Sequence, residues 1–133
     1  MGQPAAKKGD RISAMDTHVV MVPVPGSSPT PSPLPHPFNG TIAGAVSSNV
    51  NIMGQPAATV DSTADNAPPH MPMAPGTSFQ KEPSNKGTIV VGSATVKING
   101  KAAARNGDLA KTCNDPADAP VGTVMAVGTV LVG

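Results

Sequence analysis

A short block of sequence occurs three times in this chain, and that repetition constrains the fold more than any other feature. Each copy places two alanines after a glycine, a polar residue and a proline or alanine, at residues 2–6, 54–58 and 100–104. A second block, in which Gly-Thr opens a β-branched run, also occurs three times, at residues 40–42, 87–89 and 122–124. The alternation within these runs predicts strands, and Asn99-Gly100 predicts a hairpin turn.

The two ends of the chain complement each other. The first alanine block has no strand before it, and the last strand, Val130-Leu131-Val132-Gly133, has no alanine block after it. We therefore expect Gly133 to lie near Gly2, so that both ends complete one unit. The pattern predicts an all-β fold in one domain, residues 1–133: a cone-shaped, pseudo-threefold array of short β-hairpins. The first repeat unit would comprise about residues 1–39 together with the C-terminal strand, the second residues 40–86 and the third residues 87–133.

Few large side chains are available for a core, because the 133 residues include two Phe and no Trp or Tyr. A small domain with so few large apolar side chains to bury needs a further stabilising element. The single cysteine, Cys113, cannot form an internal disulfide, so a metal, a partner or both must supply it. Only 13% of the residues are charged and the formal net charge is +1, which argues against a nucleic-acid binder.

Proline is concentrated between the first repeat blocks. Seven of the fifteen residues from 23 to 37 are proline. Such a stretch is typical of a disordered or polyproline-type linker. Because repeats flank it, we interpret it instead as a stiff surface strap between units, which loses little entropy on folding.

The alanine blocks resemble the motif of PAAR-repeat proteins, a family named for the sequence Pro-Ala-Ala-Arg. The degenerate copies are Pro4-Ala5-Ala6-Lys7, Pro56-Ala57-Ala58-Thr59 and Ala102-Ala103-Ala104-Arg105, and the Arg is present only in the third, whose Pro is lost. The resemblance covers essentially residues 1–133. It implies a short cone of β-hairpins with a metal near the vertex. Such a cone sits on the blunt end of a trimeric β-helical spike in type VI secretion systems, contractile phage tails and related injection machines.

Residues of metal-binding type occur in phase with the repeats. His18 and His70 each lie 16 residues after the glycine that opens an alanine block, and Cys113 lies 13 residues after the third such glycine. Equivalent loops would each bring one ligand to a shared axis, and His36 can supply a fourth from the proline-rich segment. Three imidazoles and a thiolate complete a closed tetrahedral zinc site, and the resemblance also implies His and Cys ligands. We predict one structural zinc ion bound by His18, His36, His70 and Cys113.

The hypothesis that follows is a structural spike tip, which caps and sharpens the spike and aids membrane puncture, and not an enzyme. The sequence has no nucleophile elbow, P-loop or His-Glu-x-x-His motif. An alternative is an adaptor that docks effector cargo, with residues 71–86 as its surface. A small zinc hydrolase is a third hypothesis, and it would need an open position on the metal.

The expected partner is a homotrimeric spike protein of the valine-glycine repeat or phage spike type, bound as one chain per trimer. We expect an apolar contact at the wide base near Thr41-Ile42, Thr88-Ile89 and Thr123-Val124, transient membrane contact during puncture, and no nucleic acid. Since the N-terminus lacks the apolar segment of a secretory signal, we expect synthesis in the cytoplasm and delivery by the injection machine, out of the cell or into the target cell.

Overall fold

The computed structural model describes residues 2–133, and it confirms the predicted all-β class: these residues form thirteen β-strands and no helix. Met1, the first residue of the predicted domain and of its first unit, lies outside the described residues. Among residues 2–133, no helix is long and apolar enough to cross a membrane.

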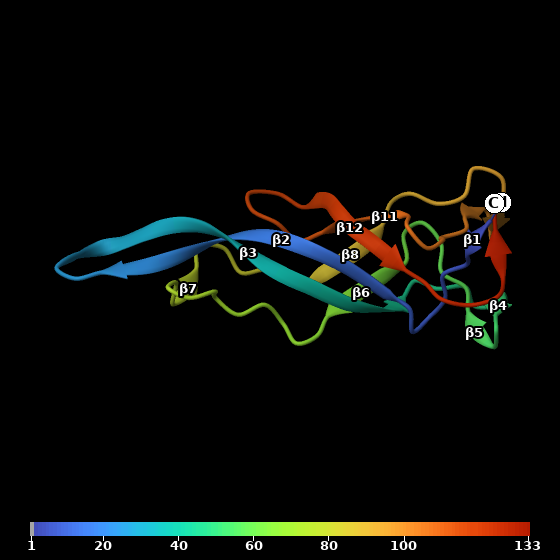
Figure 1. The fold of residues 1–133 in the computed structure, drawn as a ribbon, viewed down its shortest axis with the longest axis horizontal. Helices are drawn as coiled ribbons and strands as arrows, with labels where there is room; N and C mark the ends of the chain where they lie inside the picture. The colour runs from blue at the N-terminus through green and yellow to red at the C-terminus, as the bar shows by residue number, and fades with distance from the viewer. Residues whose placement is uncertain (1) are drawn as a thin grey trace.

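Three antiparallel hairpins close into a ring of six strands, which forms the barrel at the centre of the molecule (Figure 1). The hydrogen-bonded order is β12-β11-β8-β6-β3-β2, and β12 also pairs with β2, which closes the ring. The hairpins are β2 (Arg11–Val24) with β3 (Ser27–Gly44), β6 (Thr63–Asn66) with β8 (Lys86–Ile89), and β11 (Leu109–Thr112) with β12 (Ala119–Met125).

The glycine that precedes threonine in each repeat lies where the barrel interior has no room for a side chain. A Cβ on Gly40 would lie 2.8 Å from the Phe38 ring, one on Gly122 would lie 2.9 Å from the carbonyl oxygen of Ala110, and one on Gly87 would lie 3.2 Å from Phe38. Contacts this short force neighbouring atoms to move in a closely packed interior. The repeated glycine therefore permits the close approach of the three hairpins.

A second set of three short hairpins forms the end of the molecule that carries both chain termini (Figure 1). Two of them turn through Met53-Gly54 and Asn99-Gly100, where all four residues have φ between 51° and 82°, as a two-residue hairpin turn requires. The third consists of the paired chain ends, which the sequence predicts to meet. The pairs are β4 (Asn51–Ile52) with β5 (Gln55–Pro56), β9 (Lys97–Ile98) with β10 (Lys101–Ala102), and β1 (Gln3–Pro4) with β13 (Leu131–Val132).

The alanine blocks join the two ends of the molecule through a closed cycle of backbone hydrogen bonds. The N–H of Ala6 donates to the carbonyl of Ala104 (2.9 Å), that of Ala104 to Ala58 (3.1 Å), and that of Ala58 to Ala6 (3.0 Å). Each block thus contacts the other two in the same way, which gives the chain an internal pseudo-threefold axis. The residue limits of the repeat units remain a prediction.

Small and β-branched side chains fill the interior on either side of this cycle. One buried cluster contains Phe38, Ala6 and its two equivalents, and the other contains Ile52, Ile98 and Val132, one from each short hairpin. Ile42, Ile89 and Val124 are 0% exposed and belong to the first cluster. The predicted partner contact is therefore wrong for these three side chains, because they already form the core, and a contact near Thr41, Thr88 and Thr123 remains a prediction.

The paired ends of β2 and β3, residues 19–33, extend beyond the barrel as an arm (Figure 1). β7 (Ser78–Phe79) pairs with β2 at Val20 and Met21, on the side away from β3. Residues 23–37 were predicted to form a strap between units, and that prediction is wrong, because they belong to the two strands of this hairpin. The prolines fit a strand because they alternate, so each falls where no ladder hydrogen bond is needed.

Candidate metal centre

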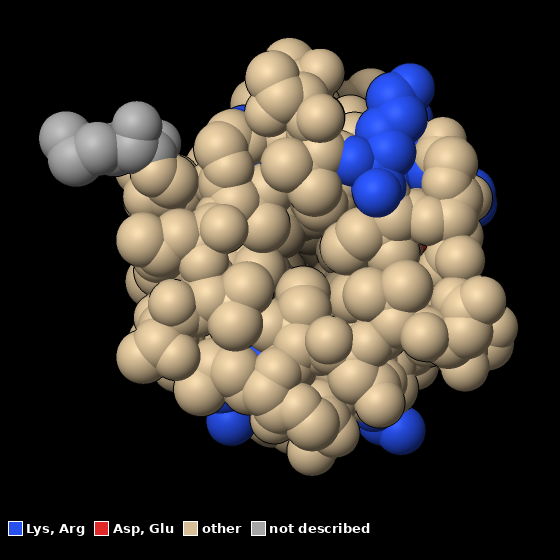
Figure 2. Space-filling view, turned by 90° about the vertical axis from the view of Figure 1, so that its right-hand side faces the viewer, with Lys and Arg blue, Asp and Glu red and all other residues tan. Residues whose placement is uncertain are grey.

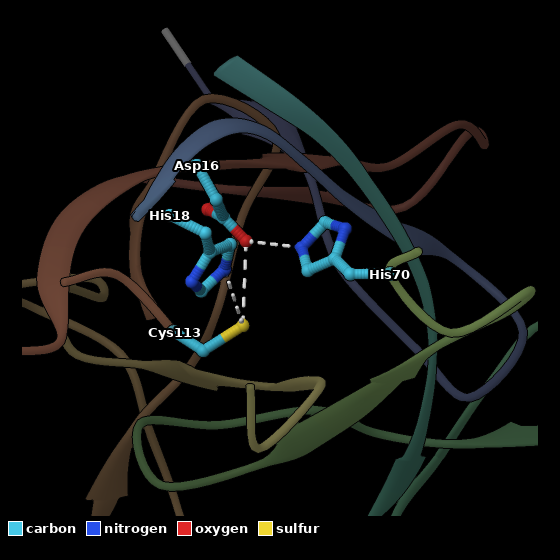
Figure 3. A group of neighbouring side chains, drawn as sticks. All are labelled: Asp16, His18, His70 and Cys113. Carbon is cyan, nitrogen blue, oxygen red and sulfur yellow. Dashed lines mark hydrogen bonds and ion pairs between the residues drawn. The ribbon is translucent and has the colours of Figure 1, made fainter. Parts of the chain in front are cut away.

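Four side chains with metal-binding atoms meet where the arm leaves the barrel (Figure 3). Asp16 and His18 lie on β2, His70 lies between β6 and β7, and Cys113 directly follows β11. Residues two apart on a strand share a face, so β2 presents Asp16 and His18 together. All four are withdrawn from solvent: Asp16, His18 and Cys113 are at most 2% exposed, and the His70 side chain is 3% exposed.

The donor atoms are close enough for a single ion. The Nε2 atom of His70 lies 2.9 Å from Oδ2 of Asp16, Sγ of Cys113 lies 3.4 Å from the same oxygen, and Nε2 of His18 lies 3.6 Å from Sγ. One atom from each residue lies within 4.8 Å of the other three. Bonds of about 2.0–2.3 Å to zinc place the ligand atoms of a tetrahedron about 3.3–3.8 Å apart. The donor atoms therefore lie close enough together to share one metal ion, and sulfur, nitrogen and oxygen are donor types that zinc accepts.

Burial shifts the pKa of two of these groups, that of His18 toward its metal-binding form and that of Cys113 away from it. Burial, and then repulsion from His70, lowers the pKa of His18 and so favours the neutral imidazole that binds metals. Burial, and then the negative charge of Asp16, raises the pKa of the Cys113 thiol to about 11. Since a metal binds the thiolate, an ion at this site would displace the thiol proton.

One buried polar atom next to the group has no hydrogen-bond partner. Nδ1 of His18 is unpaired, although Oδ2 of Asp115 lies 3.5 Å away. When an imidazole binds a metal through one nitrogen, the other nitrogen donates its proton, usually to a carboxylate or a carbonyl. The position of Asp115 suits that role, so an ion on Nε2 of His18 would explain an otherwise orphaned atom.

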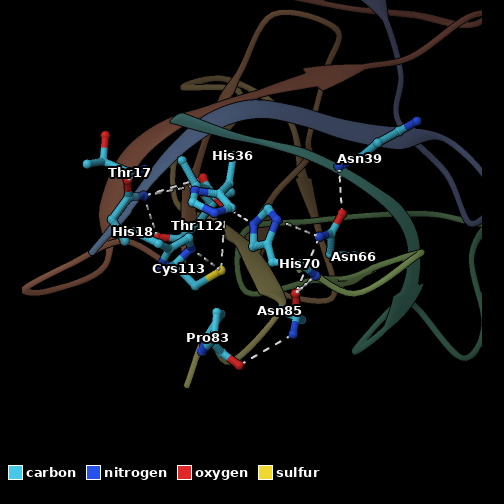
Figure 4. A network of polar contacts seen from close by, with 12 residues as sticks. Thr17, His18, His36, Asn39, Asn66, His70, Pro83, Asn85, Thr112 and Cys113 are labelled. Carbon is cyan, nitrogen blue, oxygen red and sulfur yellow. Dashed lines mark hydrogen bonds and ion pairs between the residues drawn. The ribbon is translucent and has the colours of Figure 1, made fainter. Parts of the chain in front are cut away.

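His70 is held in place by two asparagines from the same side of the barrel (Figure 4). The backbone N–H of His70 donates to Oδ1 of Asn85 at 2.8 Å, and Nδ2 of Asn66 lies 3.3 Å from Nδ1 of His70. Asn66 in turn accepts the backbone N–H of Asn39 at 2.8 Å. The irregular segment that carries His70 is therefore tied to Asn66 on β6 and to Asn85, the residue before β8.

The structure brings His18, His70 and Cys113 together as the repeat phase predicts, and His36 lies beside them. The ring of His36 is 5.4 Å from that of His18 and 5.6 Å from that of His70. Both of its nitrogens, however, contact the backbone: Nδ1 lies 2.8 Å from the carbonyl oxygen of Leu34, and Nε2 accepts the N–H of Met73 at 3.1 Å. The metal-ligand role of the four predicted residues remains a prediction.

Asp16 is the member of the group that sequence reasoning missed. A signal was present, because Asp16-Thr17-His18 precedes a β-branched run. On a strand this spacing puts the carboxylate and the imidazole on one face.

Comparison with known proteins gives a family match in the part of the chain that carries Cys113. Residues 79–133 match the family model of the PAAR motif. A search of curated proteins finds no match to the chain. The matched segment includes the third alanine block, the barrel strands β8, β11 and β12, and Cys113. Together with the three degenerate motif copies, this match supports the resemblance of the chain to PAAR-repeat proteins.

Proposed function

We propose that this protein is the tip of a trimeric β-helical spike in a type VI secretion system or a related contractile injection machine. One chain would cap one trimer and lead the spike into a membrane, in a structural role without catalysis. The PAAR motif is typical of such spike-tip proteins. The chain would be made in the cytoplasm and leave it on the machine.

The observation that carries this proposal is the cycle of three hydrogen bonds among Ala6, Ala58 and Ala104. It gives a single chain three similar sides around one axis. A spike trimer has a true threefold axis, and only a partner with matching symmetry can make similar contacts to all three subunits at once. A monomer with internal pseudo-symmetry meets that condition.

The face that would meet the spike is the end with the three short hairpins. Figure 2 shows this end as a broad surface with a shallow central hollow, where Lys and Arg lie near the rim and most of the face is uncharged. Two exposed apolar side chains belong to its hairpins, Met53 at 53% and Leu131 at 60% exposed. Exposed apolar side chains and few charges on one face are features of protein interfaces.

The mass of the complex with the spike protein of the same system tests the proposal. We expect one chain per spike trimer, measured by native mass spectrometry or light scattering. An unrelated trimeric β-helical protein is the control. A complex of three chains with three spike subunits, or no binding at micromolar concentration, would contradict the proposal.

We further propose that one zinc ion holds the arm end of the molecule together, with His18, His70 and Cys113 as ligands and His36 as the fourth residue indicated by the sequence. A structural zinc site supplies roughly 10–16 kcal/mol of apparent binding free energy, which appears as folding stability. It would join β2, the end of β11 and the segment after β6 through one side chain or more from each.

Metal analysis tests the zinc site. Protein purified without added metal should carry one zinc ion per chain, and His70→Ala and Cys113→Ala should each lower the melting temperature by many degrees, because the folded state loses bound zinc. Excess chelator is the control: with the metal removed, wild type and Cys113→Ala should melt at similar temperatures. A folded wild-type chain without metal would refute this part of the proposal.

One observation favours a second role, that of a cargo adaptor. A groove of about 480 Å³ runs beside the segment after β6 and is lined mostly by apolar atoms. Met71 and Met73, which line it, are 77% and 39% exposed. Loss of effector export in Met71→Ser, with spike binding unchanged, would support an adaptor role in addition to the tip role.

A further inference from the structure

We infer that the chain docks on the spike trimer more strongly through one side than through the other two, and that this side is an apolar seam formed by Met53, Val127 and Leu131. The inference rests on the proposed spike-tip function and specifies the residues that carry the docking. The occupant of the seam is the end of one spike subunit, while the two other subunits would meet polar residues of the tip.

The end face has three seams, because each short hairpin meets the loop that precedes another short hairpin. At two of them the contact is a hydrogen bond from a serine. The hydroxyl of Ser47 donates to Oδ1 of Asn99, whose Nδ2 donates to Asn49 at 2.8 Å. The hydroxyl of Ser93 donates to the carbonyl oxygen of Gly133. These two seams are therefore polar and are closed within the chain.

The third seam is apolar. Met53, in the turn between β4 and β5, packs against the loop between β12 and β13, since a Cβ on Gly128 would lie 2.6 Å from the Sδ atom of Met53. Val127 in that loop is 75% exposed, Leu131 on β13 is 60% exposed, and Met53 is 53% exposed. The three side chains that define this seam are therefore open to solvent in the free chain.

Backbone hydrogen bonds show which residues of the three seams are equivalent. Val130, Val50 and Val96 each accept the N–H of the first alanine of an alanine block, at 2.8, 2.9 and 3.0 Å. Three sets of equivalent positions lie three residues before, one after and three after these valines. They are Val127, Ser47 and Ser93; Leu131, Asn51 and Lys97; and Gly133, Met53 and Asn99. Each apolar residue of the third seam thus corresponds to polar residues or glycine elsewhere.

The valine at residue 127 suits its loop less well than the serine at the two equivalent positions. Oγ of Ser47 accepts the backbone N–H of Val50 at 2.9 Å, and Oγ of Ser93 accepts that of Val96 at 2.9 Å. The side chain of valine has no acceptor for such a bond. Val127 therefore gives up a loop contact and exposes an apolar side chain instead.

Met53 also stands where another residue type suits the free chain better. Its φ of 51° is close to that of Asn99, 53°, and each precedes a glycine in a two-residue turn. Asparagine adopts this left-handed conformation more readily than a long side chain does. Two residues of the apolar seam therefore break a local rule of stability, which is expected where the sequence serves a binding function.

The symmetry of the spike explains why a single apolar seam is sufficient. A homotrimer presents three identical ends around its axis, so an apolar site on each end is available three times and the tip fills it once. Met53 and Leu131 belong to hairpins of the end face that would meet the spike, where Figure 2 shows few charges. In the complex these side chains would leave water, which favours binding.

The first test makes the apolar seam polar with residues taken from the equivalent positions of the same chain. We expect Met53→Asn, Val127→Ser and Leu131→Asn together to weaken binding to the spike trimer by about 100-fold or more, measured by titration calorimetry. The melting temperature of the free chain should stay equal or rise, because serine restores the loop acceptor and asparagine suits the turn. Asn51→Lys, which exchanges polar residues between the other two seams, is the control and should change the affinity by less than about fivefold.

The second test moves the apolar residues to another seam. Asn51→Leu and Asn99→Met are added to the polar triple variant, and Ser47 is kept because it accepts a backbone N–H of its loop. Since the trimer is threefold, this chain can dock after rotation by one third of a turn. We expect it to recover at least about tenfold of the lost affinity.

A triple variant that binds the spike as tightly as wild type, or a folded chain with the transplanted residues that recovers no affinity, would overturn the inference and leave the spike-tip role intact. An equal loss in Asn51→Lys would also overturn it, because docking would then depend on the three sides alike. A wild-type chain that does not bind the trimer would overturn the spike-tip role and the apolar seam together.

Discussion

At the scale of single residues, the alanines at the centre of the repeat are fixed by both space and hydrogen bonding. Ala6, Ala58 and Ala104 are 0% exposed, and each donates one bond and accepts one bond of the cycle. The three backbones can approach one another this closely only because the side chains are single methyl groups. The repeated Ala-Ala is thus a packing requirement of the threefold axis.

Enlarging one of these alanines should destabilise the whole molecule. We expect Ala58→Val to lower the free energy of unfolding by about 1–3 kcal/mol, the usual cost of adding carbon atoms to a full core, measured by chemical denaturation. Ala43→Val is the control, because Ala43 is exposed on β3 and a β-branched residue suits a strand there. Equal stability of Ala58→Val and wild type would show that the interior around the pseudo-threefold axis can accept a larger side chain.

Much of the candidate site could be predicted from the sequence, because three of its residues follow the opening glycine of a repeat at similar distances. Those positions predicted that His18, His70 and Cys113 lie together, and the structure places them together. Asp16 has no counterpart in the other repeats, so only the strand alternation of β2 could have indicated it. The backbone bonds of His36 depend on how residues 71–73 fold against β3, which no local pattern encodes.

At the scale of elements, the prolines of β3 leave the free edge of the arm without hydrogen-bond donors. The N–H groups of Thr17 and Val19 point away from β3, since they donate to the side chains of Asn114 and Asp115. Their partners across the hairpin are Pro35 and Pro33, so the corresponding outward positions of β3 carry no N–H. Edge pairing with β6 begins only beyond the prolines, at Gly40.

This edge should resist the addition of a further strand, as edge prolines do in other sheets. We expect Pro33→Thr combined with Pro35→Thr to restore two outward donors and to cause concentration-dependent dimerisation, measured by sedimentation velocity. Ser32→Thr is the control, because Ser32 pairs with Val20 and its N–H faces β2. A monomeric double variant at high concentration would show that the prolines do not block pairing.

The same prolines explain which part of the fold could not be read from the sequence. The short β-branched runs and the Asn99-Gly100 turn predicted strands and hairpins correctly, since those signals are local. A proline-rich stretch indicates a linker when only composition is counted. Its alternation with Ser, Thr and Leu agrees with a strand, but only the pairing with β2 shows that every proline avoids the ladder.

At the scale of the whole molecule, the two proposed functions are separated along its length. The short hairpins, with an end face that carries few charges (Figure 2), lie at one end, and the arm and the candidate metal centre lie toward the other (Figure 1). From residue 17 to residue 38 the chain contains no Asp, Glu, Lys or Arg. An uncharged leading end costs less to bring into a membrane than a charged one, which agrees with the proposed direction of puncture.

This separation predicts that the end face can be impaired without loss of the fold. Leu131 lies on β13 in that face and is 60% exposed, so Leu131→Glu changes no buried packing. In the complex, the substitution would place an unpaired carboxylate in an apolar interface, which weakens binding because the charge loses its water. We expect its affinity for the spike trimer to fall at least about tenfold, as for an interface anchor worth more than about 1.4 kcal/mol, with the melting temperature and zinc content unchanged. Leu109→Glu is the matched control, because Leu109 is 43% exposed on β11 of the barrel. Equal weakening by both variants would mean that the spike contacts the side of the barrel, and weakening by neither would place the docking face elsewhere.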